Sequence, residues 1–189
     1  MSANHPKRTN ALVPKSAKSL LWPVVIVISV LLADQITKIL ALRYLAETES
    51  VAVLGRFLMF TLVYNEGGAM GTNLGSSTYY LIASILILLF VMYYIYLACR
   101  DRTLAFTLSF VAGGALGNII DRIRLGKVVD FIDVDIPDVS LFGRELERWW
   151  TFNIADSAIT CAIVVLLVRV LFVRHPKEVE SPETSPRQS

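Results

Sequence analysis

Histidine is nearly absent from this chain of 189 residues. Its two histidines, His5 and His175, lie in the polar stretches at the two ends. The body of the chain therefore offers no partner for a Ser-His or Cys-His pair and no histidine to bind zinc. The two cysteines, Cys99 and Cys161, lie at or within apolar runs. Buried thiols are usually inert, so we expect neither a disulfide framework nor a cysteine nucleophile.

Charge is scarce as well. Charged residues make up 18% of the sequence, whereas 54% is hydrophobic. The apolar residues are concentrated in blocks, which indicates a membrane protein with several spans. The formal net charge is only +2, so nothing favours nucleic acid as a partner.

Four apolar runs have or approach the length that a membrane span requires. They cover residues 20–42, 78–99, 103–120 and 152–173. A helix of the first length extends roughly 34 Å, enough for a hydrocarbon core of about 30 Å. The sequence predicts an all-α polytopic membrane protein, with a four-span domain at 20–173 between a basic tail at 1–19 and a polar tail at 174–189.

Lysine and arginine predict the orientation of these spans. They gather in the N-terminal tail, in the turn that holds Arg100 and Arg102, and after the fourth run. By the positive-inside rule these segments face the cytoplasm. Both termini are then inside, and the loops 43–77 and 121–151 are outside. Residues 57–64 are rich in β-branched and aromatic residues, so we expect a strand there, in a small sheet or cradle on the outer face of the membrane.

Polar residues lie inside or at the ends of the runs, and the predicted topology puts all of them at the outer face. They are Asp34, Lys38, Asn118, Asp121, Arg122, Asn153 and Asp156, with Asp130 just beyond the third run. Ionisable groups within a membrane are candidates for function by default. Their collection at one level favours a single site.

Several of these residues also have a purely structural interpretation. Asp34 and Lys38, one helical turn apart, could neutralise each other. Asn153, with Asp156 three residues later, resembles a helix capping box. Asp130, taken alone, could be a solvated loop residue.

Other residues at the runs have plain interpretations too. Gly113, Gly114 and Gly117 contain the spacing of closely packed helices. Arg122 could be an interfacial charge, and Arg169 is expected to snorkel toward the cytoplasmic side.

A site with several carboxylates, no histidine and no usable cysteine favours two aspartates that share a proton. One of them, ionised, takes a proton from water. The other, protonated, donates to the carbonyl oxygen as the tetrahedral intermediate forms. Such a pair requires neither a metal nor a cofactor.

Five motifs, in order within a four-span protein, carry a resemblance to a known family. "DQITK", "NEGGAMG", "GGALGNIIDR", "KVVDF" and "FNIADS" resemble the lipoprotein signal peptidases, also called signal peptidase II. The resemblance implies cleavage of prolipoproteins at the outer face of the bacterial cytoplasmic membrane, just before a cysteine that carries diacylglyceryl. It also implies contact with membrane lipids and inhibition by the cyclic peptide globomycin. We expect a monomer.

The same resemblance assigns roles to residues. Matched motif by motif, the catalytic dyad falls on Asp130 and Asp156. The supporting positions are the other polar residues of the motifs: Asp34, Lys38, Asn65, Asn118, Asp121, Arg122 and Asn153. The signal helix of the substrate would enter laterally among the spans, and the loop at 51–71 would cover the site.

Two features depart from the usual family pattern. Gly68 and Met70 stand in the Gly-rich turn where relatives often have alanine and phenylalanine, which could alter how this loop meets lipid or signal peptide. The segment after Asp130 is longer and more charged than usual, so its aspartates compete with Asp130 for the catalytic role. The competitors are Asp133, Asp135 and Asp138. Asp130 is preferred because its "VVDF" setting matches.

Three other functions stay open. A Ser-Lys peptidase could use Ser157, with Lys38 or Lys127 as its base. A proton-coupled transporter could use acids of the first, third and fourth runs as a relay, although the inner halves of the runs lack acids. A non-enzymatic assembly factor would have a phenotype that does not depend on the dyad.

Overall fold

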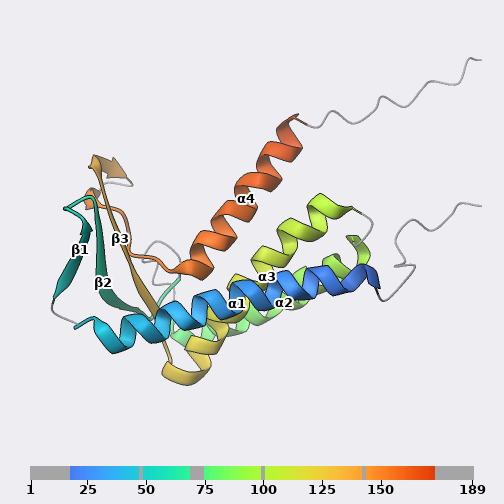
Figure 1. Ribbon diagram of the computed structural model, residues 1–189, viewed down its shortest axis with the longest axis horizontal. Coiled ribbons are helices and arrows are strands. Elements are labelled where there is room, and N and C mark those ends of the chain that lie inside the picture. Colours follow the sequence, from blue (N-terminus) through green and yellow to red (C-terminus); the bar gives the residue numbers. More distant parts are fainter. Residues whose placement is uncertain (1–17, 47–48, 69–74, 99–100, 142–143, 173–189) are drawn as a thin grey trace, which may run out of the picture.

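The computed structural model describes residues 18–46, 49–68, 75–98, 101–141 and 144–172. Within them, four helices are long and apolar enough to cross a membrane. They are α1 (Lys18–Tyr44), α2 (Ser77–Ala98), α3 (Arg102–Leu125) and α4 (Ile154–Phe172). A small antiparallel sheet lies at one end of the helices (Figure 1). The predicted fold class is therefore confirmed.

Helix α3 is the centre of the bundle and packs against α1, α2 and α4. Half of the 18-residue apolar stretch of α3 is buried, whereas only about a fifth of the corresponding stretch is buried in each of the other helices. Small residues allow this packing. A Cβ added to Gly113 would lie 2.7 Å from Val30, and one added to Gly114 would lie 2.6 Å from the carbonyl oxygen of Ala155. The close helix packing predicted from the glycine spacing is confirmed.

The sheet has the strand order β1-β2-β3-β4, with each neighbouring pair antiparallel. Strands β1 (Ser50–Leu54) and β2 (Leu58–Asn65) form a hairpin whose turn contains Gly55 at φ +56°. Strand β2 confirms the strand expected at 57–64. Strands β3 (Val128–Leu141) and β4 (Arg144–Arg148) lie within residues 121–151, where the sequence predicts a loop.

The bundle and the sheet are connected at the C-terminal end of α3 and at the N-terminal end of α4. Helix α3 runs five residues beyond the apolar run 103–120 and ends at Gly126, whose φ is +73° and whose N–H donates to the carbonyl of Arg122 at 3.0 Å. Strand β3 follows almost at once. Just before α4, Phe152 exchanges backbone hydrogen bonds with Ile132 of β3 at 2.8 and 3.0 Å. These joints bring β3 against the start of α4.

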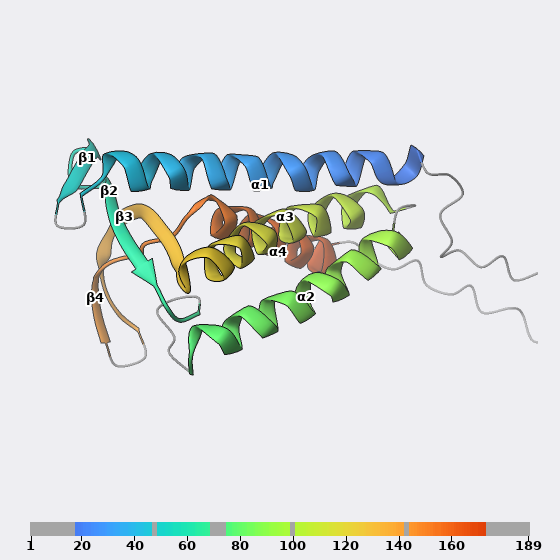
Figure 2. The same cartoon turned by 90° about the horizontal axis from the view of Figure 1, so that it is seen from below.

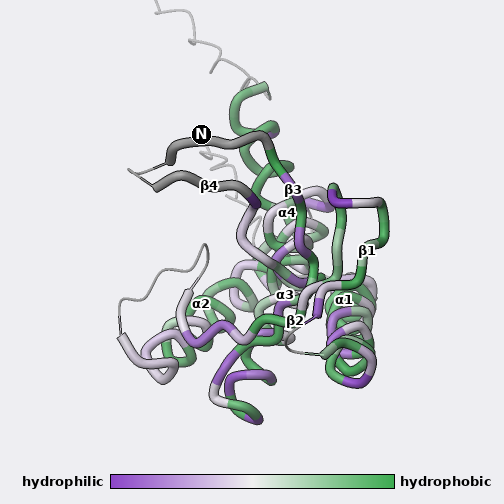
Figure 3. The backbone as a smooth tube through the Cα atoms, turned by 90° about the vertical axis from the view of Figure 1, so that its left-hand side faces the viewer, coloured by the Kyte–Doolittle hydropathy of each residue, from purple (hydrophilic) through white to green (hydrophobic). Residues whose placement is uncertain are grey.

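Hydrophobic residues run along the helices, whereas hydrophilic residues gather where the helices meet the sheet (Figure 3). The far end of the bundle, where the described chain begins and ends, is seen at the right of Figure 2. There Arg169 of α4 pairs with Asp101, the N-cap residue of α3, through a hydrogen bond of 2.8 Å and a second, shorter contact. The Arg169 guanidinium lowers the pKa of Asp101 below its ordinary value, mainly through this hydrogen bond.

Candidate active site

The start of α4 is a capping box. The side-chain oxygen of Asn153 accepts the backbone N–H of Asp156 at 2.9 Å, and an oxygen of Asp156 accepts the backbone N–H of Asn153 at 3.3 Å. The capping interpretation is therefore confirmed. It also aims the Asp156 carboxylate back toward the chain before the helix, where β3 lies.

Asp130 of β3 faces the same point from the sheet. Its side chain is 2% exposed, so it is no solvated loop residue. One carboxylate oxygen accepts the side-chain amide N–H of Asn153 at 2.7 Å, and the other accepts that of Asn65 at 3.1 Å. Asn153 thus contacts both carboxylates, Asp130 through its side chain and Asp156 through its backbone. The structure brings the two predicted dyad residues together.

The environment of Asp130 favours its protonated form. Burial raises the pKa of this carboxyl to about 7, and the negative charge of Asp156 adds to the rise. The hydrogen bonds from Asn65 and Asn153 and the charge of Lys38 oppose it. A carboxyl with such a pKa can hold a proton at neutral pH and give it to a substrate.

Asn118 of α3 connects the dyad to a buried lysine. Its amide nitrogen donates to Asp156 at 2.9 Å. Its amide oxygen accepts from the ammonium of Lys38 at 2.8 Å and from the side chain of Asn153 at 3.2 Å. The predicted supporting residues Asn118 and Asn153 therefore touch both each other and the dyad.

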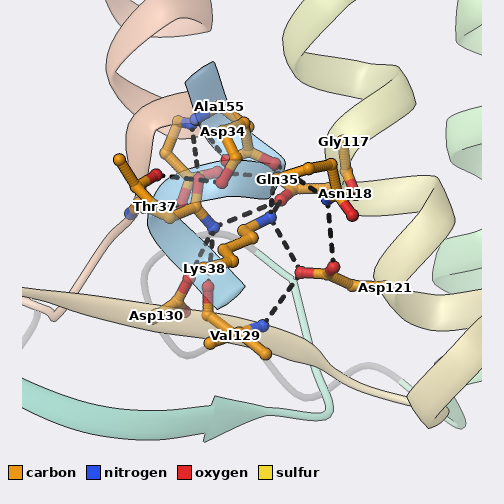
Figure 4. Close-up of polar contacts among 12 residues, drawn as sticks. Asp34, Gln35, Thr37, Lys38, Gly117, Asn118, Asp121, Val129, Asp130 and Ala155 are labelled. Atoms are coloured by element: carbon orange, nitrogen blue, oxygen red, sulfur yellow. Dashed lines mark hydrogen bonds and ion pairs between the residues drawn. The ribbon is translucent and has the colours of Figure 1, made fainter. Parts of the chain in front are cut away.

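Lys38 of α1 is 2% exposed and lies between two buried aspartates (Figure 4). Its ammonium is 2.9 Å from Asp34 and 2.8 Å from Asp121 of α3. The predicted pairing of Asp34 with Lys38 is confirmed, and Asp121 extends it to a cluster of three charges. A side chain at position 117 would overlap the carboxylate of Asp34, so Gly117 makes this cluster possible.

The charge cluster is tied to the two segments that carry the dyad. Asp34 accepts the backbone N–H of Ala155, next to Asp156, at 2.9 Å. Asp121 accepts the backbone N–H of Val129, next to Asp130, at 3.2 Å. The side-chain amide of Gln35 donates to both aspartates at 3.2 Å. Sequence reasoning assigned no role to Gln35, although it stands within the "DQITK" motif.

Arg122 holds the Gly-rich turn and is not simply an interfacial charge. Its guanidinium donates to the carbonyl oxygen of Gly67 at 2.9 Å and lies 5.9 Å from the ring centre of Tyr80. Asn65 accepts the backbone N–H of Gly67 at 3.0 Å and donates to the carbonyl of Gly68 at 3.3 Å. The turn therefore positions the amide that contacts Asp130. Met70, the other departure from the family pattern, lies outside the described residues.

Two of the aspartates that compete with Asp130 are engaged elsewhere. Asp133 pairs with Arg148 of β4 at 2.7 Å, and Asp135 lies 3.5 Å from the same guanidinium. The side chain of Asp138 lies outside the described part of the chain. Among the described acids of this segment, only Asp130 hydrogen-bonds to the residues around Asp156.

The groups of the alternative Ser-Lys pair are also engaged elsewhere. The hydroxyl of Ser157 donates to the carbonyl oxygen of Asn153 at 2.9 Å. Lys38 is held by two carboxylates and an amide oxygen. The ammonium of Lys127 lies 3.6 Å from the ring centre of Tyr64. The described contacts therefore place neither lysine as a base for Ser157.

No group of three or more histidine, cysteine or acidic residues within the described residues has the arrangement of a metal site. The two acids of α1 and α3, Asp34 and Asp121, surround the ammonium of Lys38. The two buried carboxyl groups that share Asn153 as a hydrogen-bond partner are suited to acid–base chemistry.

Comparison with known proteins supplies the family. The family model for signal peptidase II matches residues 26–172. The chain belongs to this family. It is a peptidase with several membrane spans that removes signal peptides.

Relatives agree over most of the chain. A lipoprotein signal peptidase of Chlorobium phaeobacteroides (strain BS1) is 41% identical over 142 residues, which cover 74% of this chain and 89% of the relative. One of Pelodictyon phaeoclathratiforme is 38% identical over 146 residues, covering 76% and 86%. A bacterial membrane enzyme solved by the in meso method superposes with a TM-score of 0.69 at 32% identity, covering 84% of this chain and 94% of that one.

Proposed function

We propose that this signal peptidase acts on prolipoproteins modified with diacylglyceryl and cuts just before the lipidated cysteine. Membership of the signal peptidase II family and relatives named lipoprotein signal peptidases support the substrate class. The observation that carries the chemistry is Asn153, whose side chain binds Asp130 and whose backbone binds Asp156. Two carboxyl groups joined in this way fit an aspartic peptidase.

In the proposed mechanism, a water molecule lies between Asp130 and Asp156, beside the scissile peptide bond. One carboxylate takes a proton from the water, whose oxygen attacks the carbonyl carbon. The other, protonated carboxyl donates to the carbonyl oxygen. The tetrahedral intermediate then collapses, and the leaving amine takes a proton from the dyad. No metal or cofactor takes part.

The supporting residues act through the dyad and the substrate in this proposal. Asn118 and Asn153 orient the two carboxyl groups, and Asn65 holds Asp130 from the other side. Arg122 keeps the Gly-rich turn in place. Strands β1 and β2 would hold the extended scissile segment, while the signal helix of the substrate enters laterally among the spans.

We place the enzyme in the bacterial cytoplasmic membrane, with its site at the outer face and both termini in the cytoplasm. The basic residues that the sequence has before α1, around the start of α3 and after α4 support this orientation, because the described chain begins at Lys18, enters α3 at Arg102 and ends at Phe172, all toward the end opposite the dyad (Figure 2). A monomer suffices, since all the residues named above come from one chain. A globomycin-type cyclic peptide would compete with the substrate for the site.

A cleavage assay with purified protein in detergent tests this function. The substrate is a diacylglyceryl-modified prolipoprotein, compared with its unlipidated precursor, and the product is followed by gel shift. We expect wild type to cut only the lipidated form. We expect Asp130→Asn and Asp156→Asn each to lose about 10³-fold or more in rate, because neither can complete the proton transfers.

The matched control is Asp135→Asn, which changes a carboxylate of the same strand that pairs with Arg148. It should keep near wild-type turnover. If both dyad variants stay folded and still cut, the aspartic mechanism is wrong and Ser157→Ala becomes the next variant. If wild type cuts both precursors equally, the proposed substrate specificity is wrong.

A further inference from the structure

The side-chain amide of Asn118 can have only one orientation. Its oxygen lies 2.8 Å from the ammonium of Lys38, a group that only donates hydrogen bonds. The opposite rotamer would place the amide N–H groups against that ammonium. The amide nitrogen must therefore face Asp156, where it donates to a carboxylate oxygen at 2.9 Å.

Asp156 consequently receives donors on both carboxylate oxygens. The second oxygen accepts the backbone N–H of Asn153 at 3.3 Å. Asp156 also lies in the first turn of α4, where the helix dipole favours negative charge. Each of these contacts favours the ionised carboxylate.

Asp130 differs in two respects. It lies on a strand and not in the first turn of a helix, and it is 2% exposed. Amide donors reach it too, from Asn153 and Asn65, but burial outweighs them and raises its pKa to about 7. When the dyad carries one proton, Asp130 is the better place for it.

We propose that Asp156 is the base that deprotonates the water and Asp130 is the acid, and that the buried charges around Lys38 set this assignment through Asn118. This assignment rests on the proposed function. In the first step the Asp156 carboxylate takes a proton from water, the water oxygen bonds to the carbonyl carbon, and the carbonyl oxygen takes the proton of Asp130. In the second step the C–N bond breaks, the amine takes the proton from Asp156, and Asp130 regains its proton from the intermediate.

The charged groups that face Asp156 come from each element packed against α4. Helix α1 supplies Asp34 and Lys38, and α3 supplies Asp121 and Arg122, while β3 supplies Asp130. Asp34, Lys38 and Asp121 together carry a net charge of −1 when ionised. Changing one member changes this net charge by one unit, in a direction that depends on the residue.

A pH–rate series on these variants tests the assignment. In Lys38→Met the net charge of the cluster becomes −2, and this added negative charge disfavours the ionised form of Asp156. The acidic limb of the pH profile of kcat/KM should therefore move to a pH about one unit higher. In Asp34→Asn the cluster is neutral, and the limb should move down by about as much. The double variant, Lys38→Met with Asp34→Asn, restores a cluster charge of −1, so its acidic limb should lie at nearly the same pH as that of wild type. Asn118→Leu should move the limb up, because Asp156 loses a donor.

A merely structural role for the cluster would lower activity at all pH values and leave the limb in place, and that result would overturn the proposal. Lys38→Met leaves two buried acids without their partner and could fail to fold. In that case the comparison of Asp34→Asn with the double variant still measures the loss of the Lys38 charge. Equal limbs in those two variants would also overturn it.

Infrared spectroscopy of the protein in detergent locates the proton directly. At a pH of about 6, ordinary carboxyl groups are ionised, whereas a carboxyl whose pKa is raised to about 7, as for Asp130, should keep its proton. The C=O band of a protonated acid should be present in wild type and absent in Asp130→Asn. Persistence of the band in Asp130→Asn would place the proton on Asp156. These outcomes all presuppose that the dyad variants do not cut; if they do cut, it is the proposed function that fails.

Discussion

Two asparagines distinguish the two carboxyl groups that we propose as the catalytic dyad. Asn153 contacts both aspartates, but with different groups. Its side-chain amide donates to Asp130, and its backbone N–H donates to Asp156. Asn118 donates a hydrogen bond to Asp156 and accepts one from Lys38, so it connects Asp156 directly to the lysine cluster. Chemically identical side chains are thereby given unequal tendencies to hold a proton, as an acid–base pair requires.

The raised pKa of Asp130 has a measurable consequence for the pH dependence. A group that must be protonated to act is fully available below its pKa and is lost as the pH rises through it. With a pKa of about 7 for Asp130, kcat/KM should fall above about pH 7, tending to tenfold per pH unit. The hydrogen bond from Asn65 stabilises the ionised form, so Asn65→Ala should move this basic limb to higher pH.

The control for this series is Thr107→Val, which removes a buried hydroxyl that bonds only within α3. Its basic limb should coincide with that of wild type. A limb that stays in place in Asn65→Ala would show that Asp130 is not the group that titrates there.

Helix α3 can pack at the centre of the bundle because it has small residues where it contacts the other helices. Gly117 allows the Asp34 carboxylate to come so near that any Cβ would overlap it. Gly117→Ala should therefore push α1 away from α3, lower stability by about 1–3 kcal/mol as overpacking does, and disturb the lysine cluster. Thermal unfolding in detergent and the cleavage rate are the measurements, and both should fall.

The matched comparison is Ala83→Val on the exposed face of α2, which adds bulk where no helix packs. It should leave the unfolding temperature and the cleavage rate near those of wild type. Equal losses in Gly117→Ala and Ala83→Val would contradict a specific role for the close approach at Gly117.

The sequence predicts some helices and strands of the fold but not others. The four apolar runs and β2 follow from length, hydropathy and β-branched residues. Strand β3 was missed because its aspartates suggested a solvated loop, although Asp130, Asp133 and Asp135 are separated by apolar residues in the alternating manner of a strand. Pairing with β2 and β4, which only the fold provides, makes this charged segment a strand.

The orientation that we propose for the protein in its membrane can be tested directly by labelling cysteines. In a variant with Cys99 and Cys161 replaced by serine, we introduce Phe57→Cys in the β1–β2 turn or Arg102→Cys at the start of α3, both exposed positions. A membrane-impermeant maleimide should label Phe57→Cys from outside the cytoplasmic membrane. It should label Arg102→Cys only after that membrane is permeabilised. The reverse pattern would invert the proposed topology.

The sequence by itself determined that the chain spans a membrane, which polar residues share one end of the spans, and which family its motifs resemble. These follow from hydropathy, helix period and order of motifs, all local along the chain. Only the tertiary structure decided that Asp121 shares Lys38 with Asp34, that Gln35 joins them, and that Asn153 contacts both dyad carboxyls. Such contacts join residues up to 121 positions apart. No local pattern specifies them, because they depend on how closely α1, α3, α4 and β3 pack.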